Sequence, residues 1–150
     1  MPTRFRGSVV ETRALNTFVK LLRAAESLSA RLHAPLASAG LTDGQFGVLE
    51  ALHHLGPLCQ KDLAEKLLRS GANLTLVIDN LEKRGLVRRE RNTDDRRYIT
   101  VHLTDSGRQL IVELFPQHVA RLVQELRVLS PSEQDLLLQL CRKLGPVRPD

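Results

Sequence analysis

Positively charged side chains gather in one short part of this 150-residue sequence. Residues 83–97 contain seven Lys and Arg against three Asp and Glu, whereas residues 104–145 contain five of each. Asn and Thr side chains come directly before this cluster, within residues 73–80. Guanidinium and ammonium groups bind phosphate, and Asn and Thr hydrogen-bond the edges of bases. These residue types therefore indicate chemistry directed at a polyanion such as nucleic acid.

A helix is predicted over about residues 72–84. Its apolar residues recur at the spacing of one helical face: Leu74, Val77, Ile78 and Leu81. When that face is buried, the opposite face presents the candidate base-reading residues Asn73, Thr75, Leu76 and Asn80. The candidate phosphate contacts surround this helix: Arg69 and Ser70 before it, Lys83, Arg84 and Arg89 beside or after it, and Arg96 and Arg97 in a later loop.

The elements around this helix can place it against DNA. A short helix is predicted over about residues 60–68, a turn follows over 69–71, and two strands over 86–90 and 98–103 enclose a polar loop. Two helices joined by a short turn can set the second helix in the major groove, and a charged hairpin can grip the adjacent backbone. The predicted fold is mainly α with a small β-hairpin wing, and the winged helix-turn-helix lobe spans about residues 42–103.

The remaining sequence predicts long helices around this lobe. Residues 1–10 are expected to be a loosely ordered arm, and residues 11–150 form a single domain. Helices are predicted over about 11–34, from 43 to the Gly56-Pro57 stop, over 105–128 with a kink or break at Pro116, and over 131–144. Segments 11–38 and 104–145 carry more Leu and Val than the lobe can cover, so they are expected to be dimerisation helices. The alternative is that they complete a monomeric core.

Composition restricts the class of protein. The chain is 42% hydrophobic, 26% charged and 3% aromatic, with a formal net charge of +5. We find no signal peptide and no apolar run of membrane-spanning length, and the two cysteines form no CxxC motif, so a cytoplasmic protein without membrane contact is expected. No catalytic motif is present, so an enzyme is not expected. The five histidines have no zinc-ligand spacing, and we expect no metal or cofactor.

Several runs in the sequence resemble one family. They are Gln60-Lys61-Asp62-Leu63-Ala64-Glu65-Lys66-Leu67, Leu81-Glu82-Lys83-Arg84-Gly85-Leu86-Val87, Asp95-Arg96-Arg97, and Leu103-Thr104 with Gly107. In order and spacing, residues 11–145 resemble the MarR family of bacterial regulators. The resemblance implies an obligate homodimer that binds a palindromic operator in double-stranded DNA. It also implies that Asp95 orients an arginine, either Arg97 or Arg89, and that Arg97 reaches DNA.

The resemblance also implies a signal that relieves repression. An effector cleft between the lobe and the dimer helices would be lined by Phe18, Leu22, Phe46, His53 and Phe115, residues that a plain core would equally use. Cys59 stands where Ser or Thr often caps the third helix, and a thiol there is a candidate redox sensor. The Ser70-Gly71-Ala72-Asn73 segment and the Phe115-Pro116 pair resemble a subgroup that responds to phenols and quinones.

The function predicted from the sequence is sequence-specific DNA binding that regulates transcription. The chain is expected to repress nearby genes until a small phenolic, quinone-like or oxidant signal arrives. The alternatives are a protein-interaction module and an architectural DNA-binding module without ligand sensing. Exposed Asn73, Thr75 and Asn80 favour base readout over binding by charge alone. Strong salt dependence would separate DNA binding from protein binding.

Overall fold

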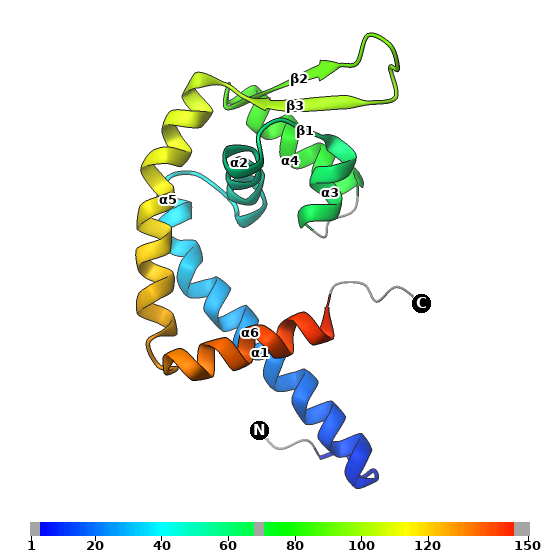
Figure 1. Ribbon diagram of the computed structural model, residues 1–150, viewed down its shortest axis with the longest axis vertical. Coiled ribbons are helices and arrows are strands. Elements are labelled where there is room, and N and C mark those ends of the chain that lie inside the picture. The colour runs from blue at the N-terminus through cyan, green and yellow to red at the C-terminus, as the bar shows by residue number, and fades with distance from the viewer. Residues whose placement is uncertain (1–3, 68–70, 146–150) are drawn as a thin grey trace.

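The computed structural model describes residues 4–67 and 71–145, and it divides into a lobe and a set of projecting helices (Figure 1). In chain order the elements are α1 (Val9–Ser38), α2 (Asp43–Leu55), β1 (Leu58–Cys59), α3 (Gln60–Leu67), α4 (Gly71–Lys83), β2 (Val87–Arg91), β3 (Ile99–Leu103), α5 (Asp105–Leu126) and α6 (Pro131–Leu144). The lobe contains α2, α3, α4 and the sheet. Helix α5 leads away from it, and most of α1 and all of α6 lie outside it (Figure 1).

The core of the lobe is built from the apolar stripes of its helices. Its fully buried members include Val48 and Leu49 of α2, Leu63 of α3, Leu74, Ile78 and Leu81 of α4, Val101 of β3 and Ile111 of α5. Burying a side chain of this size stabilises a fold by roughly 2 kcal/mol relative to leaving it in water. The predicted inward face of residues 72–84 is confirmed, with Val77 packed at the edge of the cluster.

The sheet has one more strand than the sequence predicted. Strand order is β1-β3-β2, and all neighbours are antiparallel. The hairpin strands pair with Val87 opposite Leu103 and Arg89 opposite Val101. Strand β1 pairs Leu58 with Val101 on the other edge of β3. Two residues are too short to show the alternation that marks a strand, so the sequence could not reveal β1.

Several helix boundaries agree with the predicted ones, and others correct the prediction. Capping boxes at Thr42 and Ser130 begin α2 at Asp43 and α6 at Pro131, which are the starts that the sequence predicted. A third capping box at Ser8 starts α1 at Val9, so the helix enters the segment predicted to be a loose arm. Helix α1 also continues past the predicted end to Ser38. Helix α5 passes through Pro116 as one element, so the predicted alternative of a break is wrong.

The projecting helices contribute little to the core of this chain. Helix α6 has no buried residue, and Leu36 is the buried residue of α1. An ion pair of 2.6 Å between Arg31 Nε and Glu125 Oε2 joins α1 to α5. Throughout the two described segments, no helix combines the length and the apolar character that crossing a membrane requires.

The start of α5 provides a test of how tightly the lobe is packed. A Cβ added at Gly107 would collide with the backbone carbonyl of Leu86, which accepts a hydrogen bond from the Thr104 N–H at 3.1 Å. We expect Gly107→Ala to lower the free energy of unfolding by about 1–3 kcal/mol. Denaturant unfolding would measure the change. The control is Ser106→Ala on the exposed side of the same turn, and a stabilised Gly107→Ala variant would contradict this packing.

Candidate nucleic-acid interface

Helix α4 presents a polar face on the side away from the core. Asn73, Thr75, Leu76 and Asn80 are all exposed, as the sequence predicted. Leu76 is apolar but 61% exposed, and its neighbours on this face of α4 are polar. An apolar side chain at this place can contact a thymine methyl, while Asn and Thr hydrogen-bond base edges. The predicted contacts Arg69 and Ser70 lie outside the described residues.

The loop between β2 and β3 is closed by its own hydrogen bonds. Asn92 Oδ1 accepts from the backbone N–H of Asp94 at 2.8 Å and of Asp95 at 3.2 Å. At its base, the Asn92 N–H donates to the Tyr98 carbonyl at 3.0 Å, and the Tyr98 N–H donates to the Asp95 carbonyl at 3.1 Å. The hairpin projects beyond α3 in the view of Figure 1. A polar loop held in this way can carry a charged side chain to a phosphate.

Asp95 pairs with Arg97 rather than with Arg89. The Arg97 Nε donates to Asp95 Oδ1 at 3.0 Å, and Nη2 donates to Oδ2 at 2.9 Å, so the two groups meet side by side. The carboxylate of Asp95 accepts hydrogen bonds from the Arg97 side chain, which has the larger effect, and from the Arg97 backbone N–H. These bonds hold the pKa of Asp95 below its usual range. Asp95 is therefore ionised at neutral pH. The Arg97 side chain is 87% exposed, so its outer surface faces solvent.

Two arginines that the sequence predicts as phosphate contacts make bonds within the protein. Arg84 Nη1 donates to the Gly40 carbonyl, 2.6 Å away just beyond the end of α1. Arg89 Nη1 lies 2.6 Å from Asp79 Oδ1, and its side chain is only 19% exposed. The sequence showed that both residues flank α4, but it could not show that acceptors distant in the sequence would meet them. Lys83 and Arg96 are exposed as predicted.

Gln60 is a residue of this region that the sequence analysis missed. It is the first residue of α3, and its Nε2 donates to Thr75 Oγ1 at 2.7 Å. Thr75 lies on the exposed face of α4. The bond depends on how α3 packs against α4, so no local pattern around Gln60 indicates it.

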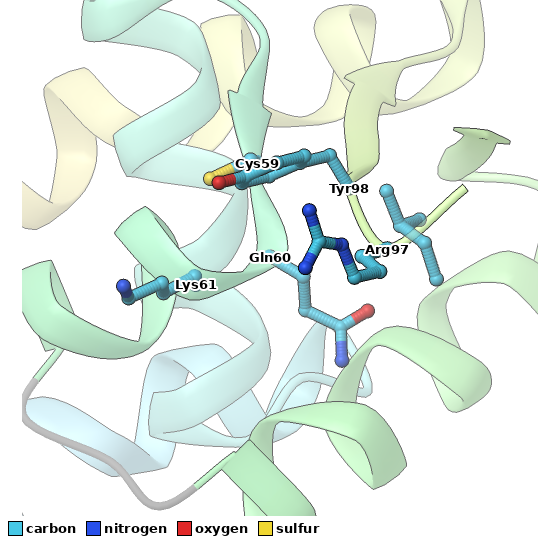
Figure 2. Close-up of a pocket in the computed structure, with 6 residues that line it drawn as sticks. Cys59, Gln60, Lys61, Arg97 and Tyr98 are labelled. Carbon is cyan, nitrogen blue, oxygen red and sulfur yellow. The ribbon is translucent and has the colours of Figure 1, made fainter. Parts of the chain in front are cut away.

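Cys59 lies beside the interface and caps α3. Its Sγ accepts a hydrogen bond from the Asp62 N–H at 3.4 Å, the role that the sequence assigned to Ser or Thr in related chains. One cavity is lined by Cys59, Gln60, Lys61, Arg97, Tyr98 and Ile99 (Figure 2). The thiol therefore shares a cavity with Arg97 of the wing.

The predicted effector residues do not enclose one pocket in the single chain. Phe46 is buried in the core and Phe115 packs against it, whereas Phe18 is 60% exposed and Leu22 is also exposed on α1. His53 is half-buried on α2. The five residues are split because the N-terminal half of α1 lies away from the lobe (Figure 1). A separate hollow lies between the end of α1 and α5, lined by Pro35, Leu36, Leu114, Gln117, His118 and Arg121.

The Asp95–Arg97 pair gives a test of the wing. Arg97→Gln should weaken binding to any duplex about tenfold. The negative slope of log affinity against log salt should become less steep by about 0.9 for each phosphate that is no longer neutralised. Asp95→Asn removes a negative charge, which alone would strengthen binding, so weaker binding would show that the carboxylate orients Arg97. Fluorescence anisotropy would measure both variants. Asp94→Asn makes the same charge change next to Asp95 and is the control; equal effects of the two Asn variants would contradict the orienting role.

Comparison with known proteins identifies the family of this chain. The MarR family model matches residues 41–99. YkoM of Bacillus subtilis (strain 168), described as an uncharacterized HTH-type transcriptional regulator, is 35% identical over 133 residues, which cover 89% of this chain and 86% of YkoM. The solved structure of Bordetella bronchiseptica BpsR has a TM-score of 0.80 at 29% identity and covers 87% of this chain and 98% of its own. NadR in complex with 4-hydroxyphenylacetate has a TM-score of 0.74 at 28% identity, covering 99% of this chain and 100% of its own. Because the similarity extends over nearly the whole sequence, the chain belongs to the MarR family of DNA-binding transcriptional regulators.

Proposed function

We propose that this regulator is a homodimeric repressor that binds a palindromic operator near the genes it controls and leaves it on a small aromatic or oxidant signal. The observation that carries the proposal is the outward face of α4 beside the Asp95–Arg97 pair. A helix with exposed Asn and Thr side chains suits the major groove, and an exposed guanidinium on a projecting hairpin suits the neighbouring backbone or minor groove.

The polar face of α4 favours sequence-specific binding over architectural binding. A protein that recognises only charge needs Lys and Arg on its surface. Here Asn73, Thr75 and Asn80 share the exposed face with Leu76. Amide groups can pair with adenine, and an apolar group can distinguish thymine by its methyl. These are groups that can tell one base pair from another.

The apolar surface outside the lobe supports a homodimer. Exposed hydrophobic side chains include Phe18, Leu21 and Leu22 on α1 and Leu136, Leu137, Leu138, Leu140 and Leu144 on α6. Apolar surface of this kind marks an interaction site or an aggregation liability. A second copy related by a two-fold axis would cover these faces and pair two α4 helices. The monomeric alternative leaves α6 without a buried residue.

Two solved relatives support an aromatic acid as the signal. The hollow between α1 and α5 has a volume of only about 20 Å³, room for a water molecule rather than a ring, but His118 and Arg121 in its lining supply nitrogen donors for a carboxylate. The solved relative NadR holds 4-hydroxyphenylacetate, and the DNA binding of BpsR is regulated by 6-hydroxynicotinic acid. Both compounds are aromatic acids with a ring hydroxyl. For a ring to follow its carboxylate to these groups, Pro35, Leu36 and Leu114 must move apart; Phe46, whose ring centroid is 4.7 Å from that of His118, adjoins the same place.

The position of Cys59 supports an oxidant as a second signal. Hydrogen peroxide transfers one oxygen atom to the thiol, which becomes a sulfenic acid, and its other oxygen leaves as water. The product would alter the cap of α3 and the cavity shared with Arg97. Because both features adjoin the DNA-facing surface, oxidation at this position would weaken operator binding.

Selection of bound duplexes from a random pool at about 150 mM salt tests the proposed function. We expect a palindrome with half-sites about one helical turn apart, roughly 10 base pairs, because two α4 helices of a dimer face one side of DNA. Sedimentation of the same sample should give the mass of a dimer. Recovery without any shared motif would favour an architectural binder, and no recovery by folded protein would favour a protein-interaction module.

Titration of the protein–operator complex tests the two signals separately. We expect 4-hydroxyphenylacetate to release the operator from the wild type but not from Arg121→Gln, since that variant loses the guanidinium. The matched ligand 4-hydroxyphenethyl alcohol, which lacks the carboxylate, should have little effect. Peroxide should release the wild type but not Cys59→Ser. A Cys59→Ser variant that is released as readily as the wild type would remove the thiol from the mechanism.

A further inference from the structure

The contacts of Arg89 could not be predicted from its charge or from its neighbours in the sequence. We propose that Arg89 is a positioning residue for DNA recognition: it fastens the wing to α4 so that both reach DNA as one rigid unit, without itself contacting a phosphate. The proposal rests on DNA binding by α4 and the wing.

The guanidinium of Arg89 spans three residues on one side of α4. Nη1 lies 2.6 Å from Asp79 Oδ1 and 3.3 Å from Glu82 Oε1, and Nη2 donates to the Thr75 carbonyl at 3.1 Å. The backbone N–H of Arg89 also donates to Glu82 Oε2 at 2.9 Å. Positions 75, 79 and 82 follow the three- and four-residue spacing of one helical face. One side chain of β2 therefore bonds to acceptors on two successive turns of α4.

The surroundings of Arg89 argue against a direct phosphate contact. Its side chain is mostly buried, whereas that of Arg97 is almost fully exposed. Asp79 and Glu82 keep part of their surface in solvent at the flank of α4, and their carboxylates adjoin the guanidinium. These two negative charges would repel a phosphate that approached Arg89. The same pairing lets Arg89 offset acidic charge that otherwise adjoins the DNA-facing side of α4.

The bonds meet at a residue that can read DNA. The carbonyl of Thr75 accepts from Arg89, and the hydroxyl of Thr75 accepts from Gln60. Thr75 is thus connected to β2 through its backbone and to α3 through its side chain. Strand β2 is an edge strand that pairs with β3, and Val87 and Val101 already anchor the base of the hairpin in the core beside α4. Arg89, which pairs with Val101 across the hairpin, adds polar bonds to α4, and we expect these bonds to set the distance between the groove-reading face and Arg97.

The experiment compares Arg89→Gln with Arg97→Gln on the selected operator and on an unrelated duplex over a range of salt. For Arg89→Gln we expect operator affinity to fall at least tenfold, affinity for the unrelated duplex to fall less, and the salt slope to stay near that of the wild type. For Arg97→Gln we expect the affinities for both duplexes to fall together. We also expect the negative salt slope to become less steep by about two per dimer, at about 0.9 for each phosphate that is no longer neutralised. Arg108→Gln in α5 is the control for the removal of one positive charge per protomer.

Two further variants keep the test decisive if Arg89→Gln folds poorly. Arg89→Lys keeps the charge but loses the planar fork, and it should show the same loss of discrimination. Arg89→Gln combined with Asp79→Asn and Glu82→Gln removes the two acids that Arg89 pairs with; it should regain affinity for the unrelated duplex but not for the operator. Melting temperature identifies any variant that is not folded.

Specific results would overturn the proposal. If Arg89→Gln flattened the salt slope as much as Arg97→Gln does and still distinguished the operator from the unrelated duplex as the wild type does, Arg89 would be a direct phosphate contact. Full discrimination in Arg89→Lys would show that charge alone suffices. If the wild type itself fails to discriminate between the duplexes, the proposed sequence-specific function fails, and that result is distinct from a failure of the Arg89 role.

Discussion

Burial of one side of α4 is the constraint on which the DNA-facing surface depends. Leu74, Ile78 and Leu81 are completely buried in one cluster with Val101 of β3. Their burial stabilises the lobe, and it leaves the helix only one orientation about its own axis. The polar side must then face solvent. A rotation that exposed these three side chains would cost several kcal/mol of apolar burial, which is comparable to the whole stability of a small domain.

The same packing sorts the arginines near α4 into two roles. Arg97 projects from the wing, with a carboxylate on one side and solvent on the other. Arg84 donates to a carbonyl just beyond the end of α1, and Arg89 bonds acceptors along α4. Asp79 and Glu82 therefore offset the charge of Arg89, whereas Arg84 bonds a neutral carbonyl and keeps its charge at the surface. Part of the charge of the basic segment joins elements, and part remains available for a polyanion.

In the described residues, the apolar side chains of the lobe are buried in one core, whereas many of those on the projecting helices are exposed. The stripes of α2, α3 and α4 meet one another, while α6 keeps its leucines exposed. Helix α5 connects the two parts, and Arg31 and Glu125 join it to α1. A partner that covers α1 and α6 would also set the spacing of two lobes. A ligand that widened the hollow near Arg121 would act on the same junction, since that hollow lies between α1 and α5.

The sequence by itself determined where the helices lie, the starts of α2 and α6 and the outward face of α4, but it placed the start of α1 too late and its end too early. Capping boxes and apolar periodicity are local, because they depend on residues three to seven positions apart. Tertiary structure decided the rest: strand β1, the bond from Gln60 to Thr75, and the partners of Arg84 and Arg89. Arg84 and Gly40 are 44 positions apart, so no local pattern links them. An arginine side chain can reach water, phosphate or a carbonyl with equal ease, and only the packed chain determines which acceptor lies within its reach.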